Sequence, residues 1–247
     1  MLLKALLHLL YPPRCPFCRE LLSPLHPGEP FLPFPAGGEG LLMGERLLCR
    51  RCAKELPWIK KACPRCAAPL EEEGKYLRCG GRMFSFDHCC ALGVYEGKLR
   101  ETVHRFKYRG EKNLAEPLGR LLAAKVAGEP WIDSASTVVP VPLHWRKLKQ
   151  RGYNQAFLLA GVLGKKLHLP VNELLERVKE TESQTGLDKR KRAANLRRAF
   201  RCKEKIPPGA HILLVDDVIT SGATAHEASC ALKEAGAARV SLAVLAR

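Results

Sequence analysis

Short apolar runs alternate with amphipathic segments through the second half of the chain. Largely apolar runs of strand length cover residues 137–141, 211–215 and 240–245, as expected for strands buried on both faces of a parallel sheet. Apolar residues recur at helical spacing over residues 99–108, 114–126, 155–167 and 224–235, and Gly236 stops the last segment. The alternation predicts an α/β fold, with a parallel sheet flanked by helices on both faces.

The first residues of the chain show a separate helical pattern. Leucines at i, i+3, i+4 and i+7 predict a short helix that packs one face onto the body of the protein, namely Leu3, Leu6, Leu7 and Leu10. Lys4 and His8 interrupt the apolar run, and no small-residue cleavage site follows it. No stretch reaches the ~18 apolar residues that a membrane-spanning helix needs. We therefore expect no membrane span and a cytoplasmic location.

Composition adds a strong positive charge. The 247 residues include 41 Lys and Arg against 25 Asp and Glu, which gives a formal net charge of +16 and a pI near 9.6. Such a surplus suits nucleic acid or phosphate-rich substrates. The length allows one α/β domain and a smaller module. We place the division at residues 1–90 and 91–247, because nine of the eleven cysteines lie in the first part.

Six of these cysteines form three Cys-x-x-Cys pairs. They are Cys15/Cys18, Cys49/Cys52 and Cys63/Cys66. Two residues between thiolates let both sulfurs bind one ion from a tight turn, and two such turns complete a tetrahedral Zn²⁺ site. The first two pairs predict a structural zinc, with the Pro- and Gly-rich residues 23–44 as an inserted loop. Four thiolates leave no open position for water, which argues against a catalytic zinc.

A second zinc site would start with Cys63 and Cys66 and add Cys79. Arg82 stands where a fourth ligand is expected, and Cys89 or Cys90 could substitute for it. Reactive redox cysteines are a minor alternative for Cys89 and Cys90. The two remaining cysteines of the chain, Cys202 and Cys230, are interpreted as small buried apolar residues.

The most unusual loop follows the predicted strand 211–215, in the segment ILLVDDVITSGATAHEA. Ligands of parallel sheets bind beyond the carboxyl ends of the strands. Two carboxylates come first, then hydroxyl and small residues that open a helix: Asp216, Asp217, Thr220, Ser221, Gly222, Ala223 and Thr224. Small residues let the backbone approach a ligand, and amides at a helix start bind phosphate. A ribose 5-phosphate fits, because its hydroxyls can donate to the acids; a simple helix cap explains neither the acid pair nor the full run.

The segment VDDVITSGAT (215–224) resembles the phosphoribosyl-pyrophosphate signature of type I phosphoribosyltransferases. The wider pattern resembles the ComF family, which joins an N-terminal double zinc ribbon to such a domain. The matching segments are LCRRCAKELPW (48–58), CPRCAAPL (63–70), ALGVYEGKLRETVHRFKYRG (91–110), VVPVPLHWRKLKQRGYNQA (138–156) and QTGLDKRKRAANLRRAF (184–200). The resemblance implies a type I phosphoribosyltransferase fold over residues 91–247 and a zinc-binding module over residues 1–90.

The resemblance also implies roles for further residues. The turn after the strand 137–141 would cradle pyrophosphate through Pro142, Leu143 and His144, with Arg146 and Arg151 preferred over Lys147 and Lys149 as the cations that stabilise it. Mg²⁺ is expected with the diphosphate, held by Asp216 or Asp217 directly or through water. A flexible loop over residues 180–198 would close over the ligand, with family matches at Gln184, Arg190, Arg192 and Asn195.

Three functions follow from the resemblance. The favoured one is a competence protein that binds phosphoribosyl pyrophosphate and Mg²⁺ and handles single-stranded DNA during DNA uptake, with a competence helicase as a partner. The alternatives are an active phosphoribosyltransferase acting on a nitrogen acceptor, as in nucleotide salvage, and a regulator that senses the metabolite. Aromatic residues lie among basic ones, as single-stranded DNA binding requires: Phe106, Tyr108, Trp145 and Tyr153. A core position is favoured for Phe106, and His104 and His144 are the candidate general bases.

Overall fold

The computed structural model describes residues 13–22, 47–70, 84–179 and 198–247. The predicted N-terminal helix, Cys79, and the four loop residues between 184 and 195 lie outside these ranges. Within the described part of the chain, no helix is long and apolar enough to cross a membrane.

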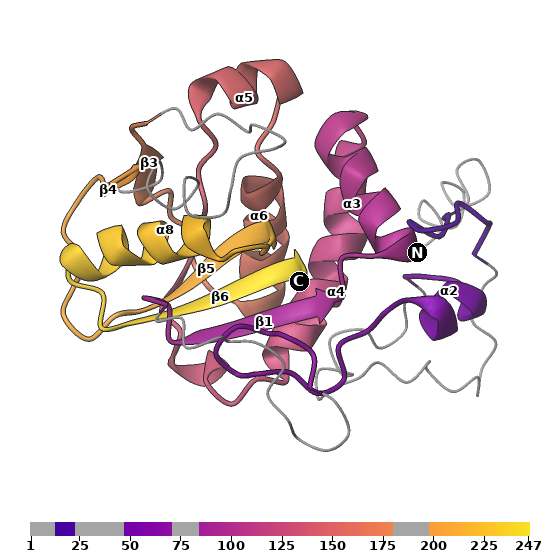
Figure 1. The fold of residues 1–247 in the computed structure, drawn as a ribbon, viewed down its shortest axis with the longest axis horizontal. Helices are drawn as coiled ribbons and strands as arrows, with labels where there is room; N and C mark the ends of the chain where they lie inside the picture. Colours follow the sequence, from indigo (N-terminus) through magenta and orange to yellow (C-terminus); the bar gives the residue numbers. More distant parts are fainter. Residues whose placement is uncertain (1–12, 23–46, 71–83, 180–197) are drawn as a thin grey trace, which may run out of the picture.

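A four-stranded parallel sheet forms the centre of the fold (Figure 1). Its strands are β1 (His88–Gly93), β2 (Thr137–Pro140), β5 (His211–Val218) and β6 (Arg239–Ala246), in the spatial order β1-β6-β5-β2. Three of these strands were predicted, and parallel pairing of β5 with both β2 and β6 confirms the expected sheet. The carboxyl ends of all four strands therefore lie at one edge of the sheet.

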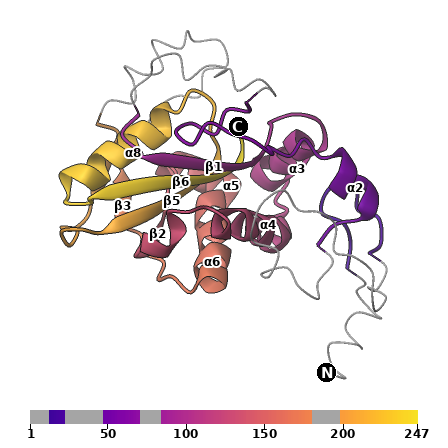
Figure 2. The ribbon, with the colours of Figure 1, turned by 90° about the horizontal axis from the view of Figure 1, so that it is seen from below.

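Helices cover both faces of the sheet, as predicted (Figure 2). Helices α4 (Ala115–Ala127) and α6 (Gln155–Leu167) lie on one face, and α8 (Ala223–Glu234) lies on the other. Helix α3 (Gly97–Tyr108) lies near the carboxyl ends of the strands, between them and the short α2 (Arg50–Glu55). Because α8 begins directly after β5, its first turn lies at the ligand-binding edge of the sheet.

The sheet separates two hydrophobic cores, and β5 contributes to both. Leu213 and Val215 face the core beneath α4 and α6, while Ile212 and Leu214 face the core beneath α8, because successive strand residues point to opposite sides. The first core continues into the cysteine-rich module, because Phe17 belongs to the same buried cluster as residues of α3. The module and the sheet therefore share one core on this side.

The remaining elements are short. They are the helix α5 (Trp145–Arg151), the antiparallel pair β3 (Leu175–Arg177) and β4 (Phe200–Cys202), and the 3-10 turns η2 (Lys112–Leu114) and η3 (Ile132–Ser134). No helix was predicted after the turn at residues 142–144, and the structure begins α5 at Trp145, after His144 as its N-cap. Helix α5 therefore projects basic side chains next to the carboxyl end of β2.

Candidate functional site

The loop between β5 and α8 is the centre of the candidate site. Strand β5 continues through Asp216 and Asp217 to Val218, three residues further than the sequence pattern predicts. Adjacent strand residues point to opposite sides of the sheet, so the carboxylates of Asp216 and Asp217 point in different directions. Asp216 lines a hollow of about 30 Å³ with the loop residues 219–225, whereas Asp217 is buried and lies against α3. The two acids thus have different surroundings.

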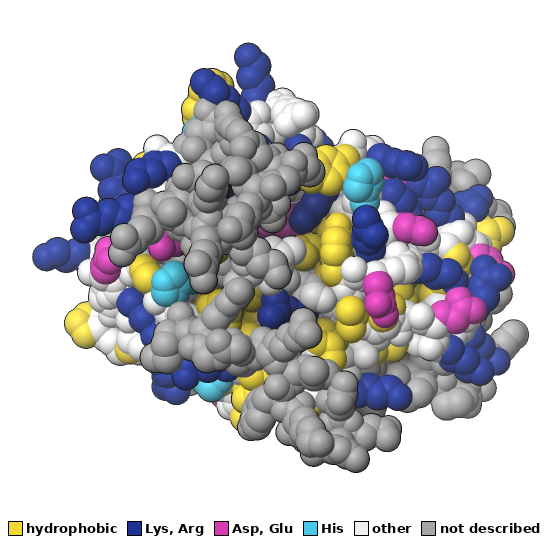
Figure 3. All heavy atoms as spheres, in the orientation of Figure 1, with side chains coloured by type: hydrophobic (Ala, Val, Ile, Leu, Met, Phe, Trp, Pro, Cys, Tyr) yellow, Lys and Arg dark blue, Asp and Glu magenta, His cyan; other side chains and the backbone are white. Residues whose placement is uncertain are grey.

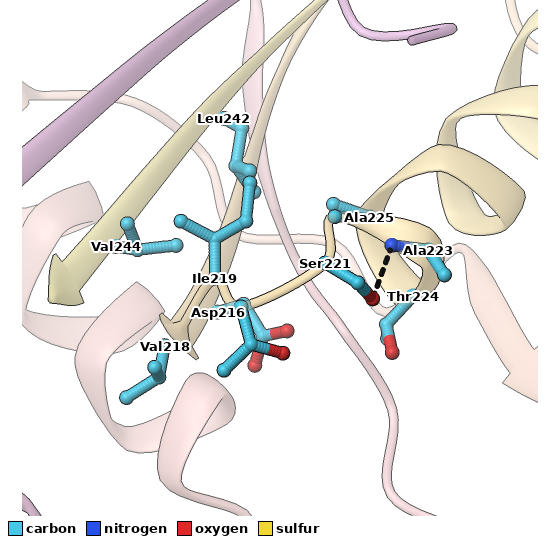
Figure 4. A pocket seen from close by; sticks show the side chains of 11 residues that line it. Asp216, Val218, Ile219, Ser221, Ala223, Thr224, Ala225, Leu242 and Val244 are labelled. Atoms are coloured by element: carbon cyan, nitrogen blue, oxygen red, sulfur yellow. Dashed lines mark hydrogen bonds between the residues drawn. The ribbon is translucent and has the colours of Figure 1, made fainter. Parts of the chain in front are cut away.

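The first turn of α8 is open to a ligand. Its N-cap is Gly222, in the left-handed conformation with φ of 79°, and this residue has no side chain that could cap the helix. Ser221 Oγ accepts from the Ala223 amide at 3.4 Å, and Figure 4 shows the Ser221 and Thr224 side chains around the same hollow as Asp216. Backbone amides at a helix start, with hydroxyl groups beside them, are groups that can bind a phosphate.

Asp216 has an unusual charge state. Burial of its carboxyl group, followed by the negative charge of Asp217, raises its pKa to about 7, although the positive charges of Lys107 and Arg177 act in the opposite direction. The Asp217 amide also donates to Asp216 Oδ1 at 2.8 Å. A hydroxyl donor or a divalent cation at this carboxylate would relieve the cost of its charge. Carboxylate oxygen is also the ligand type that Mg²⁺ prefers, so the residues present fit the ion.

Two basic residues near Asp216 and Asp217 were not predicted as site residues from the sequence. Lys107 Nζ on α3 lies 2.8 Å from Asp217 Oδ1, and both side chains are largely buried. Arg177 on β3 is close enough to Asp216 to interact with it, and burial lowers the pKa of its guanidinium. Lys107 is part of the FKYRG segment, but no spacing rule connects that segment with residues 110 positions later.

The turn after β2 places His144 and α5 at the same edge of the sheet. His144 is 6% exposed, and its Nδ1 has no hydrogen-bond partner among the described residues. The preceding Leu143 is half-buried. A buried nitrogen of this kind is costly unless a ligand or water pairs with it. This orphaned atom is consistent with the predicted ligand contact at the turn.

The two preferred arginines make contacts with aromatic rings. The Arg146 guanidinium lies 5.3 Å from the ring centre of Trp145. The Arg151 guanidinium lies 4.8 Å from that of Tyr108, and it donates to the Tyr108 hydroxyl and to Gln155 Oε1 at 3.2 Å each. Arg151 therefore joins the end of α5 to the end of α3, and Arg146 lies at the beginning of α5.

Four cysteines come together in the N-terminal module, as the sequence predicts. The sulfurs of Cys15, Cys18, Cys49 and Cys52 all lie within 4.8 Å of one another. A tetrahedral zinc site with Zn–S bonds of ~2.3 Å requires S···S distances of about 3.8 Å, and Cys18 and Cys49 are already 3.5 Å apart. The cluster therefore has a geometry compatible with one zinc ion.

The titration of these thiols also favours a cation. Burial, followed by the charge of Cys15, raises the pKa of Cys52. Burial likewise raises the pKa of Cys49. For Cys18 burial acts upward, yet hydrogen bonds from the Glu20 backbone and the neighbouring thiols lower its pKa to about 7. Four thiolates cannot coexist so closely without a positive ion.

The second cysteine pair forms a turn like that of the first pair. The Ala67 amide donates to Cys63 O at 2.8 Å, and the Arg19 amide donates to Cys15 O at the same distance. Within the described ranges, neither Cys89 nor Cys90 brings a third sulfur to Cys63 and Cys66 at metal-binding spacing. Burial raises the pKa of both thiols, which makes them unreactive. Cys79 lies outside the described residues.

Comparison with known proteins identifies the class of the α/β domain. A family model described as a phosphoribosyl transferase domain matches residues 154–247, the part that contains β5, the loop and α8. The parallel sheet flanked by helices is the type I phosphoribosyltransferase fold. A solved structure of the allosteric regulatory enzyme of purine biosynthesis is a more distant match, with a TM-score of 0.40 and 19% identity over 57% of this chain and 30% of that one. That likeness is too weak to add anything further.

Curated relatives extend the match to most of the chain. Competence protein F of Haemophilus influenzae is 32% identical over 205 residues, which cover 81% of this chain and 84% of that protein. DNA utilization protein YhgH of Escherichia coli is 30% identical over 214 residues, covering 84% and 93%. Competence protein ComFC of Bacillus subtilis is 29% identical over 215 residues, covering 84% and 87%. This chain belongs to the ComF family.

Proposed function

We propose that this chain binds phosphoribosyl pyrophosphate with Mg²⁺ at the loop between β5 and α8, and that it handles single-stranded DNA in competence or DNA utilization. The names of its relatives support the biological setting. The site supports the ligand.

One observation carries the ligand assignment: the open start of α8 lies directly beyond the carboxylate of Asp216. The amides of the first turn and the Thr224 hydroxyl bind the 5′-phosphate, which the positive end of the helix dipole also attracts. Asp216 then accepts a hydrogen bond from a ribose hydroxyl. The acid and the phosphate nest are compatible only because the sugar separates them.

The diphosphate of the ligand requires a cation. Mg²⁺ would supply positive charge to the pyrophosphate oxygens, and Asp216 would hold it, directly or through water. Asp217 does not face the ligand in this proposal, because it forms an ion pair with Lys107. Arg146 at the beginning of α5 and the turn at His144 follow strand β2, and they would bind the pyrophosphate group.

Isothermal titration calorimetry with phosphoribosyl pyrophosphate and Mg²⁺ tests this assignment. Asp216→Asn keeps the shape but removes the charge that accepts the ribose hydroxyl, and we expect affinity to fall about tenfold or more. Glu234→Gln, exposed at the end of the same helix α8, is the matched control and should bind like wild type. Equal affinity of wild type and Asp216→Asn would reject this site.

The DNA assignment is supported by an exposed surface that combines aromatic rings and arginines. We define the α3–α5 surface as Tyr108, Trp145, Arg146, Lys149 and Arg151. The two rings are 59% and 61% exposed, and each has a guanidinium on it. Figure 3 shows Lys and Arg side chains gathered over α5 at the top of the molecule. Proteins that bind single strands use this combination of stacking platforms and cations.

The other two aromatics named in the sequence are core residues. Phe106 is fully buried and Tyr153 is 6% exposed, and the Tyr153 hydroxyl donates to the Phe106 carbonyl. The prediction for Phe106 is thus confirmed, and only Tyr108 and Trp145 remain as platforms for bases.

A transferase reaction at the same site is the second candidate function. In that reaction the bond between the anomeric carbon and pyrophosphate breaks, and a bond from a nitrogen nucleophile forms. Cations stabilise the departing pyrophosphate, and α5 supplies them. Pyrophosphate release from labelled phosphoribosyl pyrophosphate, measured with cell extract and with buffer alone, separates the two functions: release above hydrolysis requires an acceptor and identifies an enzyme.

A further inference from the structure

Helix α3 lies between the four-cysteine cluster and the acid pair. A helix turns by about 100° per residue, so Lys98 and Arg105 project from one side of α3, and Lys107 projects from the opposite side. Figures 1 and 2 both show α3 between α2 and the carboxyl end of the sheet. A single helix therefore reaches both sites.

On the cysteine side, Arg105 fixes one of the two turns that supply sulfur. Its Nη1 donates to the carbonyl of Pro16 at 2.9 Å, and Pro16 lies between Cys15 and Cys18. The Arg105 side chain is only 11% exposed, and Glu111 holds it from the other side at 2.6 Å. A partly buried, bidentate arginine of this kind has one preferred position. The turn and the helix therefore move together.

A second cation on the same side contacts the cluster itself. Lys98 Nζ lies 3.7 Å from Cys52 Sγ and forms an ion pair with Glu55 of α2. Helix α3 thus contacts both cysteine pairs, the first through Arg105 and the second through Lys98.

Packing reinforces these polar contacts. Leu99, Val103 and Phe106 of α3 are fully or almost fully buried, in the same core as Phe17 and Leu56 of the cysteine-rich module. Close-packed cores transmit displacement because they contain few voids. A change in the cysteine turns therefore displaces α3.

On the pocket side, Lys107 holds Asp217 in place. The ion pair is 2.8 Å long, with the two side chains 15% and 12% exposed. Two adjacent carboxylates repel each other when both are charged, and a buried lysine next to one of them offsets this repulsion. With Asp217 paired to α3, Asp216 is the carboxylate that faces the hollow. The contact with α3 therefore fixes the position of the Asp217 side chain.

We propose that Lys107 is a positioning residue of the sugar-phosphate site, and that α3 couples this site to the four-cysteine cluster. The inference rests on the proposed binding of phosphoribosyl pyrophosphate. Ligand affinity then depends on the Lys107–Asp217 pair and on the metal in the cluster. Because coupling between two sites is reciprocal, the ligand also strengthens metal retention.

Calorimetric titration of phosphoribosyl pyrophosphate with Mg²⁺ tests the role of Lys107. We expect Lys107→Met to weaken binding about tenfold or more, because it leaves a buried carboxylate unpaired. Lys107→Arg restores the ion pair and should remain within about threefold of wild type. Arg100→Met, exposed on the same helix, is the control and should bind like wild type. Wild-type affinity in Lys107→Met would overturn the proposal.

A double-mutant cycle with Asp217→Asn separates positioning from general destabilisation. If Lys107 acts through Asp217, Lys107→Met should weaken binding by less than about twofold in the Asp217→Asn background. An equal loss in both backgrounds would show that the lysine acts elsewhere, and would overturn the proposed role. Thermal unfolding of each variant identifies any that fails to fold.

Metal removal tests the coupling. Chelation of the four-cysteine cluster, monitored by zinc release to a metallochromic indicator, should weaken ligand binding about tenfold, with recovery after zinc is added back. If the metal-free chain unfolds, the variant Arg105→Gln tests the coupling instead. This variant should keep one zinc per chain and should bind the ligand at least about threefold more weakly than wild type. Unchanged affinity in a folded metal-free chain, or in zinc-loaded Arg105→Gln, would overturn the coupling.

The wild-type measurement distinguishes this inference from the proposed function. Failure of the metal-loaded wild type to bind phosphoribosyl pyrophosphate refutes the function itself. Binding that is normal in wild type and in all of the variants above refutes only the role assigned to α3.

Discussion

The ring of Phe84 lies against Gly222 so closely that a Cβ on residue 222 would fall 2.5 Å from Phe84 Cε1. Gly222 is the N-cap of α8 and has a φ of 79°. Phe84 also packs on the cluster of Cys63 and Cys66. The aromatic ring therefore connects the second cysteine turn with the loop that we assign to the phosphate.

This contact predicts a large effect of Gly222→Ala. The methyl group meets the ring, and the left-handed backbone adds about 1 kcal/mol or more of strain, so we expect the loop to shift and ligand affinity to fall about tenfold. Gly209→Ala is the matched control, since Gly209 has a φ of 84° with nothing within 4 Å of the added carbon. Thermal unfolding should show lower stability in both variants. Calorimetry should show loss of ligand binding in Gly222→Ala alone.

The four-cysteine cluster predicts one tightly held zinc ion per chain. Cys49→Ser removes one ligand and should abolish zinc retention through dialysis, with loss of stability in the module, because metal binding is part of its folding free energy. Cys202→Ser, a cysteine of β4 outside the cluster, should keep its zinc. Elemental analysis of the purified proteins decides. A folded wild-type chain without metal would contradict the assignment.

The α3–α5 surface predicts single-stranded DNA binding that depends on its aromatic rings and on its positive charges. Replacing Tyr108 or Trp145 by Ala removes a stacking platform and should weaken binding of an oligothymidine about tenfold each, since stacking contributes ~1–3 kcal/mol per base. Tyr108→Phe keeps the ring and should bind normally. Fluorescence anisotropy at low and high salt also tests the cations. Lys149→Gln should reduce the salt dependence, whereas Arg239→Gln, exposed at the start of β6, should not.

His211 predicts a loss of stability in acid. It is buried, with its two ring nitrogens 2.8 Å from the hydroxyls of Ser134 and Ser241. Burial, followed by the charge of Arg239, lowers its pKa from 6.5 to about 4. The neutral ring therefore stabilises the fold fully above pH 6.5, and this contribution is lost as pH falls toward 4.

The expected loss is on the order of 2 kcal/mol between pH 7 and pH 4.5. Urea unfolding at the two pH values measures it. His211→Gln, which cannot titrate, should show a correspondingly smaller change with pH, and the exposed His104→Gln should behave like wild type. An identical pH dependence in His211→Gln would show that other groups control acid stability.

Local patterns were sufficient for much of the fold and for the centre of the site. The helix over residues 155–167 is found with the predicted bounds, because its apolar period and its polar N-terminal residue are both local signals. The acids, the hydroxyls and the small residues of the loop are adjacent in the sequence. Their chemistry is therefore readable without the fold.

Several elements had no usable local signal, among them α5 and β1. Helix α5 contains no buried residue, and its seven residues include only two apolar positions, Trp145 and Leu148, which are too few to define a helical period. Strand β1 begins with His88, Cys89 and Cys90, and the two cysteines were interpreted as possible metal ligands. In the structure both are buried in the sheet, where cysteine behaves as a small apolar side chain.

The contacts of Lys107 and Arg177 depend on tertiary structure. Lys107 reaches Asp217 only because α3 lies near the carboxyl end of the sheet. Arg177 belongs to the short strand β3, which is distant from Asp216 in the sequence. A pattern within one segment does not specify which distant segment it meets. The same limit applies to Phe84 and Gly222.

Both outer strands of the sheet are covered by short segments of the chain itself. Beside β1, the Val94 amide donates to Pro57 O and the Cys89 amide donates to Pro64 O. Beside β2, Val138 exchanges backbone hydrogen bonds with Pro170 and Asn172. Exposed strand edges invite pairing with other chains, and here several backbone groups at both edges are already paired. Another protein is therefore expected to dock on side chains rather than extend the sheet by a strand, which also limits aggregation.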